Sequence, residues 1–422
     1  MIMRKFSFVI SAVLGLGLSV SAASLQGVGA MGEDVWPTDA AALGRGMAGS
    51  AMPEEGFSLL NPARMAFDTK TRFNLSLDYQ GVYARQGSLS LGRDRFDISG
   101  FGFSVPLRSI GAFGFGIWQS NTEFFKAISK VDSVQTASVQ HQGSIFELVP
   151  SYALRLPSVL RFISIGAALH VPMGQSTHVV SNSIDTTQLD SVSRALIGTV
   201  DVEDRLTGEW GCKDQLGVPG YISGTVQIHS KKSDFFVSGW APHTLTQTFH
   251  RTQSLSSSDT VAQTAWEQEI KIPWQWVAGL SLEPWSKHHF SVEFFQRSTD
   301  DSVVAGLGWE GVPAQFDRNG MQRTLAIGWQ HDGSFVSFDP FFTKNSFRAG
   351  AWAREWYLKG VSEAAGTVGI GIPLGKRGAK LDFALYSGIR DFSDPLTGYE
   401  SFWGMKIGLS GIGAWGESLR HR

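Results

Sequence analysis

This chain of 422 residues has a single cysteine, a small net charge and few long apolar runs. Each of these features excludes a class of protein. The single cysteine, Cys212, cannot form an internal disulfide. A net charge of −2 gives no electrostatic basis for binding nucleic acid. After residue 22 no run of about 18 apolar residues occurs, so the sequence predicts no transmembrane helix. A membrane role would therefore require a closed β-barrel, whose backbone groups are all bonded in lipid.

The one apolar run lies at the start of the chain. Arg4 and Lys5 precede an apolar stretch over residues 6–20, which ends in the small residues Ser21 and Ala22. This order is typical of a secretory signal peptide cleaved after Ala22 or Ala23. The run is also shorter than the roughly 20 residues that a spanning helix needs. We therefore expect residues 1–22 to be a signal peptide and the mature chain to be exported.

Apolar and polar residues alternate along most of the mature chain. Phe73, Leu75, Leu77 and Tyr79 share one face of the first such segment, and the pattern returns as far as Leu409. Because side chains on a strand point to opposite faces with period two, each segment predicts a β-strand with one apolar face. About fourteen strands are predicted, at residues 72–85, 94–105, 111–119, 145–156, 161–172, 220–229, 235–250, 268–283, 288–298, 321–331, 347–358, 365–374, 379–390 and 401–412.

The connections between these strands alternate in length. Short connections are expected near 106–110, 156–161, 230–234, 284–288 and 375–378. Long polar connections are expected at 120–143, 173–219, 251–266, 299–320 and 391–400. Short turns at one rim and long loops at the other are typical of an outer-membrane barrel, whereas a soluble sandwich has no reason to sort its loops.

The two faces of the strands favour the same conclusion. Glycine (48 residues) and aromatic residues (12%) are both abundant. We expect the aromatic faces to meet lipid and the polar faces to line a wet lumen. The predicted lipid-facing tryptophans are Trp274, Trp276, Trp329 and Trp403. The predicted luminal residues are Asp78, Glu147, Arg155, Lys271, Glu293, Asp382 and Lys406. A secreted β-sandwich is the alternative.

Residues 23–71 do not alternate, and they are rich in glycine, alanine and methionine. Their apolar content argues against disorder, because disordered segments have low hydrophobicity. We expect them to pack inside the barrel as a plug. The predicted organisation is a signal peptide (1–22), a plug (23–71), a transmembrane barrel (72–412) and a C-terminal tail (413–422).

The motif within the plug resembles the FadL family of outer-membrane transporters. It consists of Leu43-Gly44-Arg45, Ala48-Gly49, the acidic pair Glu54-Glu55, Ser58 and Asn61-Pro62-Ala63. The resemblance implies a fourteen-stranded barrel with an N-terminal luminal hatch. It also implies passage of long-chain fatty acids and other hydrophobic compounds. This chain departs from the family at two places. Relatives often carry Asp-Asp where it has Glu54-Glu55, and outer-membrane barrels often end in phenylalanine, whereas this chain ends in a basic tail. Arg64 also resembles the PorV-type barrels of a protein secretion system.

The sequence therefore predicts an outer-membrane channel for passive uptake of hydrophobic small molecules. The alternative is a PorV-type barrel that serves protein secretion. Expected partners are a hydrophobic or lipid ligand, outer-membrane lipid and the barrel-assembly machinery, with no nucleic acid. An enzyme is not expected, because no nucleophile elbow or triad spacing is present, although a barrel lipase stays open as a third hypothesis. No metal or cofactor is expected either. The glycines at 44, 46 and 49 match a dinucleotide fingerprint but lack its preceding strand.

Two features are candidates for gating. The resemblance places a hatch at Leu43, Gly44, Arg45 and Gly49, and we expect movement around Asn61-Pro62-Ala63 to open the lumen. The predicted third strand carries Gly111, Gly114 and Gly116, and interior glycines often mark a bulge or bend. The family's lateral opening lies in the corresponding strand. The other interpretation is that these glycines only relieve crowding beside the plug.

Overall fold

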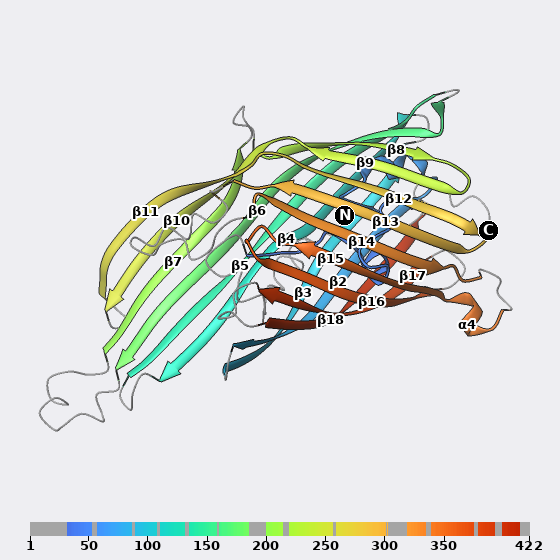
Figure 1. Cartoon of the computed structure of the whole chain (residues 1–422). Coiled ribbons are helices and arrows are strands. Elements are labelled where there is room, and N and C mark those ends of the chain that lie inside the picture. The colour runs from blue at the N-terminus through green and yellow to red at the C-terminus, as the bar shows by residue number, and fades with distance from the viewer. Residues whose placement is uncertain are drawn as a thin grey trace, which may run out of the picture.

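The computed structural model is a closed barrel of 14 antiparallel strands, as the sequence predicted (Figure 1). It describes residues 32–52, 57–86, 89–107, 110–130, 135–157, 160–184, 200–213, 219–255, 259–300, 302, 319–334, 339–374, 379–392 and 399–413. The predicted signal peptide, the acidic pair Glu54-Glu55 and almost all of the predicted tail lie outside these residues. Within them, no helix is long and apolar enough to cross a membrane.

Eleven wall strands are continuous. They are β2 (Thr71–Gln86), β3 (Leu89–Pro106), β4 (Ala112–Lys130), β5 (Gln135–Arg155), β6 (Ile163–Ile184), β13 (His288–Ser298), β14 (Met321–His331), β15 (Ser346–Glu355), β16 (Val361–Leu374), β17 (Ala379–Phe392) and β18 (Tyr399–Gly413).

Three further wall strands are interrupted and carry two labels each. They are β7 (Val200–Lys213) with β8 (Tyr221–His229), β9 (Ser233–Trp240) with β10 (His243–Leu255), and β11 (Asp259–Ile272) with β12 (Gln275–Trp285). The remaining elements are β1 (Glu33–Asp34), the helix α2 (Ala40–Gly44), the 3-10 helix η2 (Pro62–Phe67) and the helix α4 (Phe341–Lys344).

The first and last wall strands close the barrel. β18 pairs with β2 along its whole length, from Gly413 opposite Thr71 to Tyr399 opposite Arg85. The other wall strands pair antiparallel with their neighbours in the order of the chain. Closure matters because a strand edge left unpaired in hydrocarbon would carry unsatisfied backbone groups.

The alternation in the sequence becomes an apolar outer face and a polar inner face. Leu385 and Trp403 are each 53% exposed on the outside, and their neighbours Ala384 and Phe402 are buried on the inside. The predicted luminal residues Asp78, Glu293, Asp382 and Lys406 are buried inside the barrel. The outer belt includes Phe73, Phe113, Ile165, Ile222, Val226, Val237, Leu280, Leu282, Phe290, Val292, Leu325, Ile327, Val368, Leu385 and Leu409.

Two predicted luminal residues lie elsewhere. Lys271 is exposed on the outer face, while its neighbours Ile270 and Ile272 are buried inside. The sequence predicted a single strand over residues 268–283, in which even-numbered residues would share a face, but Leu280 and Leu282 are exposed outside. The alternation shifts by one residue where Pro273 separates β11 from β12, because proline cannot donate to the ladder. Arg155 lies exposed at the short-turn rim, with its guanidinium 5.1 Å from the centre of the Phe67 ring.

The wall is much taller on one side than predicted. Most of the expected polar connections at 120–143, 173–219 and 251–266 are strand, and the whole of β7 was missed. The ends of β4, β5 and β6 that lie away from the short turns, together with β7, β10 and β11, form a sheet that extends beyond the other strands, at the left of Figure 1. We call it the flared sheet. These segments lack the lipid-facing alternation because they lie above the apolar belt, where an outer face can be polar.

A charge introduced into the apolar belt provides a test of the fold. Leu385→Arg places a cation on the outer face, and such substitutions cost about 2–4 kcal/mol near the middle of a bilayer. We expect the barrel's free energy of unfolding from phospholipid bilayers, measured by denaturant titration, to fall by that amount. Glu267→Arg, on the exposed face of the flared sheet, is the control and should change it little. Equal effects of the two changes would contradict the assigned lipid face.

Candidate functional site

The N-terminal residues pack against the inner face of the wall. We call residues 32–52 and 57–67 the luminal segment. Its helix α2 contacts β15, β16, β17 and β18, and η2 contacts β3, β4, β5, β6 and β8. The segment therefore touches opposite sides of the barrel.

Glycines allow part of this segment to lie directly against the wall. A Cβ at Gly350 of β15 would lie 2.2 Å from the backbone carbon of Arg45. One at Gly328 of β14 would lie 2.3 Å from the carbonyl oxygen of Arg45. Gly46 has a φ of +68°, which favours glycine. Gly44 and Gly46 of the glycine motif thus pack closely against the wall, whereas a Cβ at Gly49 would meet the side chain of Arg45.

Hydrogen bonds from wall side chains hold the same stretch. The backbone N–H groups of Gly49 and Ser50 both donate to Glu293 Oε1, the first at 2.6 Å. The N–H of Gly46 donates to Thr367 Oγ1 at 2.9 Å, and that hydroxyl donates to the carbonyl of Gly44 at 3.1 Å. Leu43, Gly44, Arg45 and Gly49, predicted from the resemblance, thus lie together against β13–β16.

The Asn61-Pro62-Ala63 stretch lies at the start of η2 on the other side of the barrel. Asn61 Nδ2 donates to the carbonyl of Ser50 at 2.8 Å and to Gln227 Oε1 at 2.9 Å. A Cβ at Gly166 of β6 would lie 2.5 Å from the backbone nitrogen of Ala63. Asn61 thus links the two halves of the luminal segment to each other and to β8. Its role in gating stays a prediction.

Among the described residues, the wall parts between β3 and β4. These strands pair from Pro106 opposite Ala112 to Gly100 opposite Trp118, and β4 then continues to Lys130 without β3. Both strands are irregular at this fork. The β2–β3 register shifts at Ser99, and the β4–β5 register shifts at Ser120. Such bulges bend a strand away from its partner. We call this break the seam.

The luminal segment fills the start of the seam. β1 pairs with the free edge of β4, with Glu33 opposite Thr122 and Asp34 opposite Asn121. The N–H of Val35 donates to the carbonyl of Ser120 at 2.8 Å. A two-residue strand from the lumen therefore takes the place that β3 gives up.

Charges on the opposite wall hold β1 there. Asp34 Oδ2 accepts from Arg297 Nη2 and from Gln322 Nε2, both at 2.5 Å. Glu33 Oε1 accepts from Arg390 Nη2 at 2.7 Å. Burial favours the neutral acid, but Arg297 and Arg354 outweigh it and hold the pKa of Asp34 below its usual 3.8. We call these contacts of Glu33 and Asp34 the latch.

The glycines predicted to bend the third strand lie just below the fork. Gly114 and Gly116 are paired regularly with both neighbouring strands, and the irregularity lies at Ser120 instead. A Cβ at Gly114 would lie 2.3 Å from Met65 Sδ, and one at Gly116 would lie 2.4 Å from Phe57 Cε1. Gly111 has a φ of +116° at the turn before β4. Close approach of the luminal segment accounts for Gly114 and Gly116. Their part in an opening stays a prediction.

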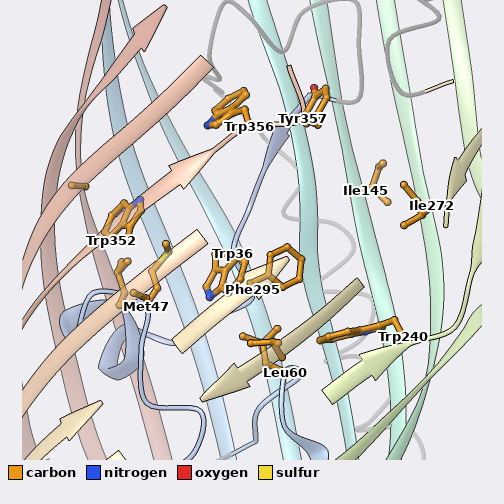
Figure 2. Close-up of a cluster of buried hydrophobic side chains, with 14 of the residues drawn as sticks. Trp36, Met47, Leu60, Ile145, Trp240, Ile272, Phe295, Trp352, Trp356 and Tyr357 are labelled. Atoms are coloured by element: carbon orange, nitrogen blue, oxygen red, sulfur yellow. The ribbon is translucent and has the colours of Figure 1, made fainter. Parts of the chain in front are cut away.

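Apolar side chains gather in the lumen beside the latch. Trp36, directly after β1, meets Phe295 edge to face with ring centres 4.8 Å apart (Figure 2). Phe295 in turn lies 6.4 Å from Trp240. The same buried cluster includes Met47, Leu60, Ile145, Ile272, Trp352, Trp356 and Tyr357. The lumen thus offers aromatic and aliphatic contacts, in contrast to a purely aqueous pore.

Comparison with known proteins identifies the family. The BamG family model matches residues 6–420. The chain belongs to the BamG family. No curated protein matches this BamG-family chain in sequence.

Solved structures share the fold of this BamG-family chain at low sequence identity. A Pseudomonas aeruginosa FadL homologue has a TM-score of 0.58 at 14% identity, over 91% of this chain and 99% of its own. The Ralstonia pickettii toluene transporter TbuX has a TM-score of 0.57 at 14% identity, over 89% and 98%. The P. putida toluene transporter TodX has a TM-score of 0.54 at 10% identity, over 90% and 100%. The fourteen-stranded barrel expected from the FadL resemblance is confirmed.

The latch and the seam were missed from the sequence. Glu33 and Asp34 precede the motif that carries the resemblance, and they have no strand pattern of their own. Ser120 lies in a polar stretch that was taken for a loop. One signal was present, since Glu33 and Asp34 are the only charged residues between Ala23 and Thr38.

Filling the space at Gly350 tests whether the luminal segment depends on this contact. Gly350→Val would force the backbone of Arg45 and Gly46 off β15, because overpacking costs about 1–3 kcal/mol. We expect faster trypsin cleavage at Arg45 in the folded, detergent-solubilised barrel. Gly366→Val is the matched control, because a Cβ there has no atom within 4 Å. Unchanged cleavage in Gly350→Val would show that the segment is held without this contact.

Acid should release the latch. The Asp34 ion pair stabilises β1 above pH 3.8, and this stabilisation is lost as the pH falls through the lower pKa of the folded state. We expect amide exchange at Val35, corrected for its intrinsic pH dependence, to rise across that window. Asp34→Asn should show the faster exchange already at neutral pH and no further step. A step of the same size in Asp34→Asn would assign the transition to another group.

Proposed function

We propose that this protein is an outer-membrane channel for passive uptake of neutral hydrophobic small molecules. The observation that carries the proposal is the seam between β3 and β4, closed by β1 and adjoining an apolar luminal cluster. A hydrophobic solute gains little from a water-filled pore, because its apolar surface is stabilised only where water is excluded. A path from apolar lumen to lipid through a break in the wall avoids the aqueous phase.

The charges of the lumen favour a neutral solute over a fatty-acid anion. A carboxylate ligand would need a cation, and the buried Arg348 and Arg390 are already paired with carboxylates. Arg348 Nη1 lies 2.6 Å from Asp382, and Arg390 contacts Glu33, Glu363 and Glu400 at 2.7–3.0 Å. Taking a carboxylate from such a pair would leave a buried charge uncompensated, which costs about 3–5 kcal/mol. Two similarly folded proteins are named toluene transporters, which fits this preference.

In the proposed cycle the solute displaces the luminal segment and leaves through the seam. β1 is held by the latch, by its short ladder with β4, and by hydrogen bonds from the side chains of Asn121 and Arg354. Its release would expose the upper edge of β4 and open the lumen sideways. The fastening of Gly46, Gly49 and Ser50 to β13–β16 would keep the rest of the segment in place. The opening is thus proposed to be local.

A reversible lock on β1 tests this cycle. Asp34→Cys with Asn121→Cys joins two residues that face each other across the β1–β4 ladder, in a Cys212→Ser background. We expect oxidised barrels in liposomes to take up toluene no faster than empty liposomes. Reduction should restore uptake to at least the unsubstituted rate, since the Asp34 side of the latch is also lost.

The control for the lock is a disulfide in the intact wall. Gly366→Cys with Ser387→Cys joins paired residues of β16 and β17 away from the seam, and it should leave uptake unchanged. If the unsubstituted protein does not accelerate toluene uptake at all, the channel function is wrong. If it does and the locked form conducts equally well, the seam is not the exit.

A second candidate is service to the barrel-assembly machinery, suggested by the BamG family match. The structural observation in its favour is that ion pairs and the luminal segment occupy the lumen. Under this function, the barrel would act with its lumen occupied by the luminal segment and its seam closed. Depletion would lower the amounts of other outer-membrane barrels, while toluene uptake in liposomes would match empty vesicles. These two results together would replace the channel proposal.

A further inference from the structure

The flared sheet has an open edge outside the closed part of the barrel. β11 pairs with β10 from Ile272 opposite His243 to Asp259 opposite Leu255. No other described strand pairs with β11. Its continuation β12 differs, because β9 and β13 flank it on both sides. Figure 1 shows β11 as the outermost strand of the flared sheet. Fourteen residues thus form one edge of a sheet above the apolar belt.

Charged side chains are the main protection of this edge against pairing. Natural edge strands are shortened, bulged, interrupted by proline or charged, and β11 carries Glu267, Glu269 and Lys271 on its outer face. β11 contains neither proline nor glycine, and its register with β10 is unbroken from Ile272 to Ala262. Its one irregularity lies near the tip, opposite Gln253 and Ser254. A long, regular edge of this kind is a template for an added strand.

One hydrogen bond shows which backbone groups face outward from this edge. The N–H of Lys271 donates to Ser302 Oγ at 2.8 Å, so it points away from β10. Because backbone groups alternate in direction along a strand, those of Glu269, Glu267 and Ala265 point to the same side. Ser302 caps the end nearest the barrel, which leaves the stretch towards the tip for a partner.

The side chains of the edge define the chemistry of the partner. Glu267 and Glu269 are exposed on the outer face, and their Cα partners on β10 are the neutral Thr248 and Thr246. On the inner face Trp266 stacks on Phe249, with ring centres 5.2 Å apart, and Ile270 is buried. A strand that alternates basic and apolar residues would match both rows, because opposite charges across a ladder attract.

We propose that the open edge of β11 is a docking site for an extended segment of another protein that alternates basic and apolar residues. The segment adds as a further antiparallel or parallel strand of the flared sheet. Main-chain hydrogen bonds supply affinity, and Glu267 and Glu269 supply the charge preference. This proposal is independent of whether the barrel serves transport or assembly.

The test uses a synthetic nine-residue peptide that alternates lysine and valine, with the detergent-solubilised full-length protein. Binding is measured by fluorescence anisotropy of a dye on the peptide. The unsubstituted protein should bind it more tightly than a glutamate–valine peptide. Glu267→Lys with Glu269→Lys should weaken binding about tenfold, equivalent to 1.4 kcal/mol, and reverse the preference. Glu209→Lys on β7, also exposed on the outer face, should leave binding unchanged.

A proline substitution separates strand addition from simple charge attraction. Ala265→Pro removes one outward-facing N–H and keeps the ladder with β10, and we expect it to abolish binding. Ala265→Ser keeps that N–H and should bind normally. Heat-modified migration on gels checks that every variant is a folded barrel.

Three results would overturn the proposal. The first is equal binding by Ala265→Pro and Ala265→Ser. The second is equal binding of the lysine peptide before and after charge reversal. The third is binding only after residues 303–318, which follow Ser302, are replaced by a glycine–serine linker. That result would make this chain the occupant of its own edge.

Discussion

Every backbone N–H and C=O within lipid must find a partner inside the protein, and the architecture depends on this constraint. The pairing of β18 with β2 meets it for the wall as a whole. At the fork above Gly100 and Trp118, β4 loses its neighbour on one side. The short ladder with β1 restores part of that pairing. The luminal segment is therefore a structural part of the wall as well as an occupant of the lumen.

A second constraint is the free-energy cost of burying charge, and it explains why the charged groups of the interior are paired. An isolated ion in a low-dielectric interior is strongly disfavoured, so buried charges occur in groups that compensate one another. Arg390 meets carboxylates from three elements, β1, β16 and β18. Its guanidinium also lies 4.6 Å from the centre of the Trp356 ring. The network joins parts that are distant in the chain. Removing Glu33 from it, as release of β1 requires, leaves Glu363 and Glu400 to balance Arg390.

The period-two pattern predicted which residues face lipid wherever a strand crosses the apolar belt. The pattern failed where the two faces of a strand do not differ in polarity. β7 was missed because both of its faces are partly polar above the membrane, and Lys271 was misplaced because Pro273 shifts the alternation by one residue. Gly44, Arg45 and Asn61, which belong to the plug motif, lie against the wall, and their role in a hatch stays a prediction. The partners Arg297 and Arg390 could not be predicted, because a strand pattern gives the face of a residue but not its neighbour across the lumen.

The closure of β18 on β2 also imposes an order on biogenesis. β2 can pair with β18 only after the last strand has been made. This pairing joins the wall strands most distant in sequence, and non-local contacts form slowly. The luminal segment precedes β2 and is enclosed by the finished wall. Its backbone at Arg45 lies directly against Gly328 and Gly350 of the wall. We therefore expect the luminal segment to be in place before β18 pairs with β2, so that the wall closes around it.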